Sequence, residues 1–193
     1  MRVCVYGSAS DNIDENYKIK TFELGKELAS RGHTLIFGAG SEGLMGAVAR
    51  GFKAGKGHVH GVIPKFFEEG GYEAIFYDAD EITYTETMAE RKAKMEDGCK
   101  AFIIVPGGIG TFEEFFQVFT LKQLGRHEKA ITLYNIDGYY DHMIEMLKKS
   151  MDAGFINKEC EKLIKSFDNP TDLIEYIEEY DPGDVSWDAL KRN

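Results

Sequence analysis

The residues best suited to chemistry lie in one glycine-rich segment, Pro106 to Glu114, which directly follows an apolar run. Three of the four positions after Pro106 are glycine, and Thr111 comes next. Glycine lets the backbone approach a ligand closely, so this run can form a concave row of N–H donors suited to a phosphate. Thr111 and Glu114 also match a capping box, in which both side chains satisfy the first amides of a helix. Capping does not explain the glycines that precede them.

A second glycine-rich segment, Gly38 to Gly46, also follows an apolar run and opens an amphipathic stretch. Its context suits an anion, because glycines permit close backbone approach and the following helix offers its positive end. The segment lacks the Lys-Ser/Thr ending of a P-loop, and its glycine spacing fits a dinucleotide fingerprint poorly. A tight strand-to-helix turn explains it equally well.

Between these two loops, Thr87 to Met95 is a helical segment with adjacent positive charges at Arg91 and Lys92. Such a run usually forms a solvated, charged helix face. Alternatively, Arg91 points into a cleft, where its planar guanidinium can hold the base or phosphate of a nucleotide through paired hydrogen bonds. The local pattern leaves both alternatives open.

Short apolar runs bounded by glycine alternate with longer amphipathic stretches along the chain, a pattern typical of βα units around a mostly parallel sheet. Several runs are uniformly apolar, which predicts strands covered by helices on both faces. The expected strands are Val3 to Tyr6, Thr34 to Phe37, His58 to Ile63, Glu81 to Tyr84, Ala101 to Val105 and Ala130 to Tyr134. In such a sheet, ligands bind at the carboxyl ends of the strands, where both glycine loops lie.

The expected helices fill the intervals between these strands. Apolar residues recur at helical spacing from Tyr17 to Leu28, and Arg31-Gly32 closes that segment. Further helices are predicted over Leu44 to Ala54, Glu86 to Glu96, Thr111 to Leu124, Tyr140 to Met151 and Thr171 to Tyr180. We expect one three-layer α/β domain over residues 1–180 and a polar tail over residues 181–193 that holds the only tryptophan, Trp187.

The 193 residues include 33 Asp and Glu against 23 Lys and Arg, which gives a formal net charge of -10. This acidic balance argues against general binding of nucleic acid or of an anionic membrane, while local phosphate binding is still allowed. Cys4, Cys99 and Cys160 lie in or beside apolar runs, which predicts reduced, mostly buried thiols. With no signal-peptide pattern and no apolar stretch of about 18 residues, we expect a cytoplasmic protein without a membrane span.

Taken together, these motifs resemble those of the LOG family, the cytokinin-activating nucleoside 5′-monophosphate phosphoribohydrolases once labelled lysine decarboxylases. The resemblance covers most of the chain and becomes weak after about residue 170. It rests on Gly7-Ser8, Gly40 to Gly46, Ile63 to Lys65, Met88-x-x-Arg91-Lys92, Pro106 to Glu114, Gln123 to Lys129, Asp137 to Asp141 and Gly154 to Ile156. The sequence departs from the family pattern at Ala89, where many members have histidine, and at Ala39, where a triple glycine is common.

The resemblance implies a Rossmann-like fold, a homodimer, and hydrolysis of the N-glycosidic bond of a nucleotide to a free base and ribose 5-phosphate. By motif, the catalytic arginine of the family corresponds to Arg91 and its catalytic glutamate to Glu114, and both are intact. The implied substrate is AMP or a cytokinin nucleotide, with no metal and no cofactor. The two departures remove neither catalytic group but can alter the preference for the base, which the sequence leaves open.

The chemistry of glycosidic cleavage fits these two residues. Cleavage passes through an oxocarbenium-like state, and a carboxylate such as Glu114 can stabilise its charge, activate water or hold the ribose hydroxyls. Arg91 keeps its proton because the guanidinium pKa exceeds about 12, so we assign it to positioning the nucleotide and stabilising charge on the departing base. The expected phosphate contacts are Gly107, Gly108, Gly110 and Thr111, with Ser8, Gly40, Ser41 and Lys92 as further substrate-binding residues.

Other functions remain as alternatives. A nucleotide sensor or molybdenum-cofactor binding protein of the same fold would bind without cleaving, and the intact pair Arg91 and Glu114 disfavours it. A pyridoxal-phosphate decarboxylase needs a Schiff-base lysine, and nothing in the chain singles one out. The five histidines show no metal-ligand spacing, so we interpret them as structural or solvated. The excess of phenylalanine from Phe112 to Phe119 predicts a helix buried against both the sheet and a dimer partner.

Overall fold

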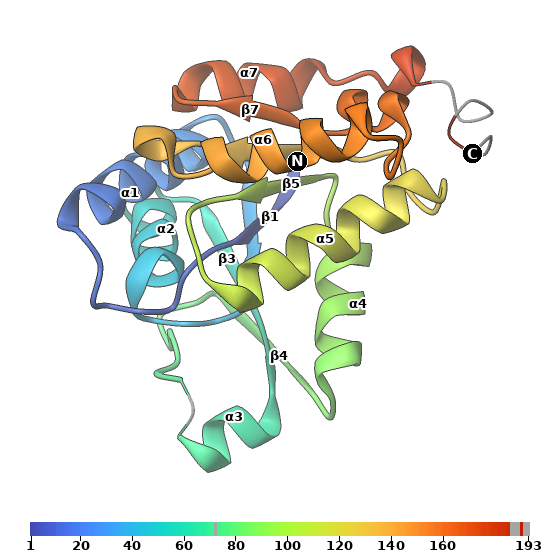
Figure 1. Cartoon of the computed structure of the whole chain (residues 1–193). Helices are drawn as coiled ribbons and strands as arrows, with labels where there is room; N and C mark the ends of the chain where they lie inside the picture. Colours follow the sequence, from blue (N-terminus) through green and yellow to red (C-terminus); the bar gives the residue numbers. More distant parts are fainter. Residues whose placement is uncertain (72, 186–189, 191–193) are drawn as a thin grey trace.

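The structure is a computed structural model and describes residues 1–71, 73–185 and 190. A seven-stranded sheet with the order β4-β3-β2-β1-β5-β6-β7 runs through its centre (Figure 1). Each pair of neighbouring strands in this sheet is parallel. The predicted α/β class with a mostly parallel sheet is confirmed.

The strands are short and correspond to the apolar runs of the sequence. Their bounds are β1 Arg2–Tyr6, β2 Thr34–Phe37, β3 His58–Pro64, β4 Glu81–Thr85, β5 Ala101–Ile104, β6 Ala130–Tyr134 and β7 Lys165–Phe167. The six predicted strands are confirmed, with ends that move by at most one residue. The apolar pattern does not predict β7, because only Phe167 among its three residues is apolar.

Helices connect successive strands. Their bounds are α1 Glu15–Ser30, α2 Gly43–Ala54, α3 Lys65–Gly70, α4 Met88–Gly98, α5 Ile109–Gln123, α6 Asp141–Asp152 and α7 Pro170–Glu179, with short 3-10 turns at Ile136–Gly138, Lys158–Leu163 and Pro182–Asp184. The predicted helices are confirmed with shifted ends. The six-residue helix α3 is missing from the predicted set because it is too short to show an amphipathic period.

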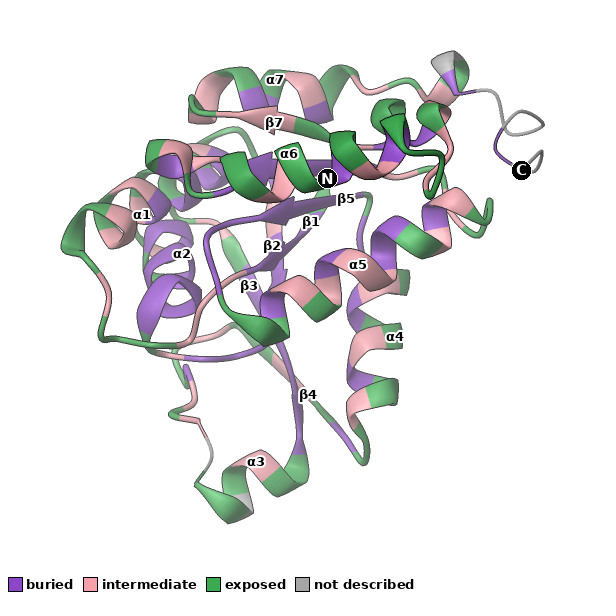
Figure 2. Cartoon of the chain, in the orientation of Figure 1, coloured by how far each residue is buried: buried purple, intermediate pink, exposed green. Residues whose placement is uncertain are grey.

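Helices cover both faces of the sheet. Because successive strand residues point to opposite faces, Val3 and Val5 pack in one core with α1, α2 and α7, whereas Cys4 and Tyr6 pack in a second core with α4, α5 and α6. Figure 2 shows the central strands buried between these two layers. This three-layer arrangement explains why the central strands β1, β5 and β6 are almost uniformly apolar.

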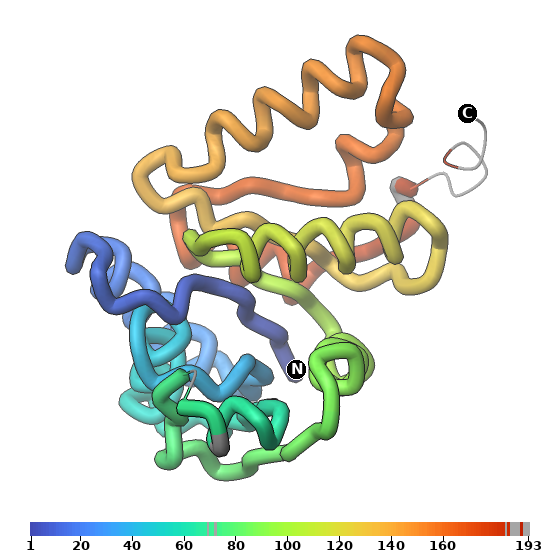
Figure 3. The backbone as a smooth tube through the Cα atoms, turned by 60° about the horizontal axis from the view of Figure 1, so that its bottom comes forward, coloured from blue at the N-terminus to red at the C-terminus, as the bar shows by residue number. Residues whose placement is uncertain are grey.

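The order of the strands reverses direction between β1 and β5. Figure 3 shows the segments from the N-terminus to α4, in blue to green, on one side of the molecule and those from α5 onward, in yellow to red, on the other. The loops that follow β1, β2 and β5 therefore meet at the carboxyl edge of the sheet. This edge at a reversal of strand order is the place where open α/β sheets bind ligands.

The remaining predictions concern the cysteines and the tail. Cys4, Cys99 and Cys160 are free and buried, as predicted. Val185 and Leu190 are buried in the second core, and Trp187 lies outside the described residues. Among the helices that the structure describes, none is both long and apolar enough to cross a membrane.

Candidate active site

The second glycine loop links β5 directly to α5. The helix begins at Ile109, with extended Gly108 as its N-cap and no side-chain capping bond. Phe112 N donates to Gly108 O at 3.0 Å and makes the first hydrogen bond of the helix, so the amides of residues 109–111 have no acceptor within the helix. The capping-box alternative for Thr111 and Glu114 is wrong, because the helix starts before Thr111 and both residues lie inside it.

A cavity of about 290 Å³ opens beside this loop, at the edge where the strand order reverses. Both predicted catalytic residues, Arg91 and Glu114, line it. Its other lining residues are Gly7, Ser8, Ala9, Met45, Glu73, Gly108, Gly110 and Thr111. The cavity thus brings together the two candidate catalytic side chains and four of the predicted substrate contacts, namely Ser8, Gly108, Gly110 and Thr111.

Arg91 reaches the cavity from α4, a helix whose N-cap Thr87 accepts a hydrogen bond from Glu90 N at 3.1 Å. Only 7% of Arg91 is exposed, which excludes the solvated helix face. Its guanidinium donates from Nε to Val62 O at 3.1 Å and from Nη2 to Gly38 O at 3.2 Å. These carbonyls at the ends of β3 and β2 fix the plane of the guanidinium.

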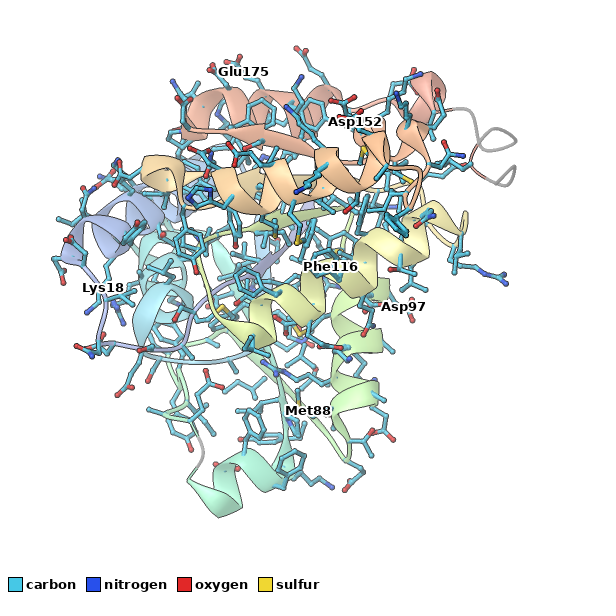
Figure 4. All side chains as sticks on the ribbon, viewed as in Figure 1. Lys18, Met88, Asp97, Phe116, Asp152 and Glu175 are labelled. Carbon is cyan, nitrogen blue, oxygen red and sulfur yellow. The ribbon has the colours of Figure 1, made fainter. Side chains whose placement is uncertain are left out.

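Two neutral side chains also contact Arg91. Its guanidinium carbon lies 5.6 Å from the centre of the Phe67 ring. Nη1 lies 3.9 Å from the sulfur of Met88, the first residue of α4, which is labelled in Figure 4. Neither neighbour neutralises the guanidinium, whose charge acts on the two carboxyl groups of the cavity, Glu73 and Glu114.

Glu114 lies about one turn after Thr111 on α5 and lines the same cavity. Burial raises the pKa of its carboxyl to about 7; the charge of Arg91 opposes this rise, and the carboxylates of Glu113 and Glu73 add to it. Near neutral pH this carboxyl is close to its titration midpoint, which suits a group that exchanges a proton during a reaction.

Side chains and backbone from two other segments hold the second loop in place. Ser8 N donates to Pro106 O at 3.0 Å, which ties the end of β1 to the loop. The hydroxyl of Tyr139 donates to Gly107 O at 2.7 Å, and that of Tyr140 donates to Val105 O at 2.8 Å. With these carbonyls engaged, the loop holds a fixed conformation beside the cavity.

Atoms of the chain itself fill the first glycine loop. The amides of Leu44 and Met45, at the start of α2, donate to Ser8 O at 2.8 and 3.2 Å. Gly40 and Ser41 are not among the described residues that line the cavity. The helix end that the sequence offers to an anion is therefore already occupied by a carbonyl oxygen.

Lys92 and Gly107 lie next to the cavity and do not belong to its described lining. Lys92 Nζ donates to Glu113 Oε1 at 2.6 Å and so links α4 to α5. Gly107 lines an adjoining cavity of about 280 Å³ that shares Ser8 and Gly108 with the first. The remaining walls of this second cavity are Ile13, Asp14, Tyr17, Leu44, Pro106 and Tyr139.

Glu73 is the one charged residue of the described cavity lining that the sequence pattern misses. It lies between α3 and β4, and no recognised motif or element expected from the sequence includes it. The cue in the sequence is indirect: Gly40 leaves room that the Glu73 carboxylate fills. Only the folded structure brings these two residues together.

Comparison with known proteins reveals relatives over nearly the whole chain. The model of the family described as "Possible lysine decarboxylase" matches residues 45–177. Cytokinin riboside 5′-monophosphate phosphoribohydrolase LOG7 of Arabidopsis thaliana is 37% identical over 197 residues, covering 99% of this chain and 90% of that protein. The chain belongs to the LOG family. The LOG phosphoribohydrolase of Oryza sativa subsp. japonica is 39% identical over 191 residues, covering 97% of this chain and 78% of its own length.

Solved structures share the fold of this LOG-family chain at lower identity. The molybdenum cofactor carrier protein of Chlamydomonas reinhardtii matches with a TM-score of 0.69 and 23% identity, over 92% of this chain and 96% of that one. The molybdenum cofactor binding protein of Rippkaea orientalis matches with a TM-score of 0.66 and 18% identity, over 92% and 93%. At these identities the similarity establishes the Rossmann-like fold and leaves the ligand open.

Proposed function

We propose that this LOG-family protein hydrolyses the N-glycosidic bond of a nucleoside 5′-monophosphate to a free base and ribose 5-phosphate. The observation that carries the proposal is that Arg91 and Glu114 line one cavity with residues of the second glycine loop. The first amides of α5 and its positive helix end suit the phosphate of such a substrate. The curated relatives are named as phosphoribohydrolases of cytokinin riboside 5′-monophosphates.

We assign different catalytic roles to Glu114 and Arg91. With the phosphate on Gly108, Gly110 and Thr111, ionised Glu114 takes a proton from the attacking water and stabilises the positive charge that develops on the ribose. Arg91 stays protonated and stabilises the negative charge on the departing base. A group with a pKa near the working pH serves such a proton transfer well.

We assign AMP or a prenylated adenine nucleotide as the substrate, a homodimer as the assembly and the cytoplasm as the compartment. Support for the dimer comes from the outer surface, where Ile109 is 83% and Phe155 is 84% exposed, because exposed apolar side chains of this size favour contact with a second copy. Light scattering tests this assignment, since it separates the mass of a dimer from that of the 21.7 kDa chain.

The family description "Possible lysine decarboxylase" points to a different reaction. A decarboxylase that uses pyridoxal phosphate needs a lysine to form the Schiff base. The described lining of the candidate active site includes no lysine, and Lys92 beside it is paired with Glu113. The geometry therefore favours the hydrolase.

The test incubates the purified protein with AMP and with isopentenyladenosine monophosphate and follows free base by chromatography. We expect base release from at least one substrate, reduced by about 100-fold or more in Glu114→Gln because general acid–base groups contribute on this scale. Glu128→Gln is the matched control, since it makes the same chemical change at an exposed residue outside the described cavity lining and we expect it to keep its activity. Nucleotide binding without base release in the wild type would contradict the proposal and favour a nucleotide-binding or cofactor-binding role.

A further inference from the structure

A third charged side chain, Glu73, lines the candidate active site. It lies in the segment between α3 and β4, which is pinned to the first glycine loop by backbone hydrogen bonds. Ser41 N donates to Ala74 O and Phe76 N donates to Ala39 O, both at 2.8 Å. These two bonds lie on either side of Gly40 and bring Glu73, the residue before Ala74, to the edge of the cavity.

Packing reinforces this placement of Glu73. Phe76 is buried, and its ring packs edge-on against Phe37 with the ring centres 6.1 Å apart. Gly40 leaves the space that the carboxylate needs, because a Cβ atom at that position would collide with Glu73 Oε1. The glycine of the first loop therefore accommodates an acidic side chain of the same molecule.

Glu73 faces charged groups from three elements. Burial raises the pKa of its carboxyl, the positive charge of Arg91 on α4 opposes this rise, and the carboxylate of Glu42 ahead of α2 adds to it. Glu73 in turn raises the pKa of Glu114 on α5. The cavity thus holds two carboxyl groups whose neutral forms are favoured by burial, and the guanidinium of Arg91 opposes this effect on both.

Hydrolysis of a purine nucleotide needs a proton on the departing base. When the bond from C1′ to N9 breaks, its electron pair goes to the purine, which leaves more easily if a ring nitrogen such as N7 is protonated. Arg91 does not supply this proton, because a guanidinium does not give up a proton in proteins. Among the described residues of the lining, only Glu73 and Glu114 are carboxylic acids, and Glu114 is committed to the water.

We propose that Glu73 is the general acid of the reaction, an inference that rests on the proposed phosphoribohydrolase function. The Glu73 carboxyl gives its proton to the purine while Glu114 takes a proton from the water, whose oxygen forms the new bond to C1′. The products are the neutral base and ribose 5-phosphate, and the two carboxyl groups exchange protons with solvent before the next cycle. Because Glu73 comes from the β2–β3 side and the phosphate cradle from the β5 side, the base lies toward Glu73.

The test compares two substrates with different needs for a proton. AMP requires protonation of its base, whereas 4-nitrophenyl ribofuranoside 5-phosphate releases a nitrophenolate that is stable as an anion. For Glu73→Gln we expect kcat on AMP to fall by about 100-fold or more, as for loss of a general acid, and kcat on the nitrophenyl substrate to stay within about threefold. Glu114→Gln loses both activities, because both reactions need the activated water.

Asp78→Asn is the matched control for this experiment. Asp78 is exposed, lies in the same segment between α3 and β4 as Glu73 and is not among the described cavity residues, so we expect the activity of this variant on both substrates to match the wild type. Thermal unfolding of each variant verifies that the fold is kept. The pH profile of kcat on AMP gives a second measure, in which the basic limb of the wild type disappears in Glu73→Gln.

Each outcome decides between distinct accounts. If kcat of Glu73→Gln falls equally on both substrates, or does not fall on AMP, the general-acid role is overturned. If the wild type cleaves AMP but not the nitrophenyl substrate, the pH profile of kcat on AMP decides. A basic limb that persists in Glu73→Gln overturns the general-acid role, and a basic limb that disappears supports it. A wild-type protein that cleaves neither substrate overturns the proposed function itself, and the role of Glu73 falls with it.

Discussion

The two glycine loops look alike in sequence and differ in what occupies them. Each follows the carboxyl end of a strand, β2 or β5, and each opens a helix. In the first loop, Ser8 O accepts the amides at the start of α2, and the Glu73 carboxylate lies against Gly40. In the second loop, a Cβ atom at Gly108 or Gly110 would meet nothing within 4 Å, and both residues line the cavity.

This contrast separates two reasons for a glycine. In the first loop the missing side chain makes room for the protein, so glycine is needed for folding. At Gly108 and Gly110 of the second loop the missing side chain leaves open space beside helix amides, so these glycines are available for a ligand, whereas Gly107 makes room for Thr111. Substitutions that add one methyl group to either loop distinguish these reasons, because they affect stability in one case and substrate affinity in the other.

The largest effect is expected from Gly43→Ala in the first loop. Gly43 has φ 55°, and a Cβ atom there would lie 2.6 Å from both Ser8 O and Ser10 O. Left-handed strain and overpacking together lower the free energy of unfolding by about 3 kcal/mol. Urea unfolding measures this loss, and a Gly43→Ala variant as stable as the wild type would show that the first loop is not closed by packing.

A smaller effect, of opposite sign, is expected at Glu114 in the helix of the second loop. Its folded-state pKa of about 7 lies above the ordinary value of 4.5, so the stability from its neutral form is complete at low pH and is lost as pH rises toward 7. At about pH 8, Glu114→Gln is therefore more stable than the wild type by about 2 kcal/mol, a figure reduced for water in the cavity. Thermal unfolding at about pH 8 and about pH 4 tests this, since the gain should vanish at the lower pH.

Gly108→Ala tests the proposed phosphate site of Gly108, Gly110 and Thr111 directly. Gly108 is extended, with φ -91°, so alanine fits the backbone and we expect unfolding to change by less than about 0.5 kcal/mol. The new methyl group enters the space proposed for the phosphate and weakens a charge-assisted hydrogen bond to it, which raises KM for AMP by about tenfold. Steady-state kinetics checks this expectation, and an unchanged KM would move the phosphate away from Gly108.

The smallest effect is expected from Gly110→Ala. Gly110 lies in the first turn of α5, where alanine has the better helix propensity and stabilises the fold by about 0.5 kcal/mol. The same methyl group also narrows the cavity, so KM for AMP rises while stability improves. A variant that gains stability without any change in KM would indicate that the glycine has no role in binding.

Much of this fold follows from the sequence because its cues are local. Apolar runs identify most of the six predicted strands, since β1, β2, β5 and β6 are buried on both faces and leave few polar positions. The glycines after Pro106 indicate the proposed phosphate site. The start of α5 is harder to predict, because Ile109 and Gly110 carry no capping side chain and tertiary packing alone sets the first turn. The short strand β7 lacks an apolar run because it lies at the edge of the sheet and is only partly buried.

The sequence does not reveal which glycine loop is open. That difference depends on Glu73 and Ser8, which reach the first loop from segments distant in the chain. Arg91 is intermediate: its motif marks it as important, but its burial depends on carbonyls at the ends of two strands. Contacts of this kind arise from the folded chain, so no local pattern carries them.

A crystal structure of Glu114→Gln bound to AMP tests the central claim most directly. We expect the phosphate within hydrogen-bond distance, about 2.7–3.2 Å, of the amides of Gly110 and Thr111, with the base toward Glu73. A phosphate bound instead to residues 40–43 would show that the first loop opens for substrate, and it would contradict the assignment of the second loop as the nucleotide site.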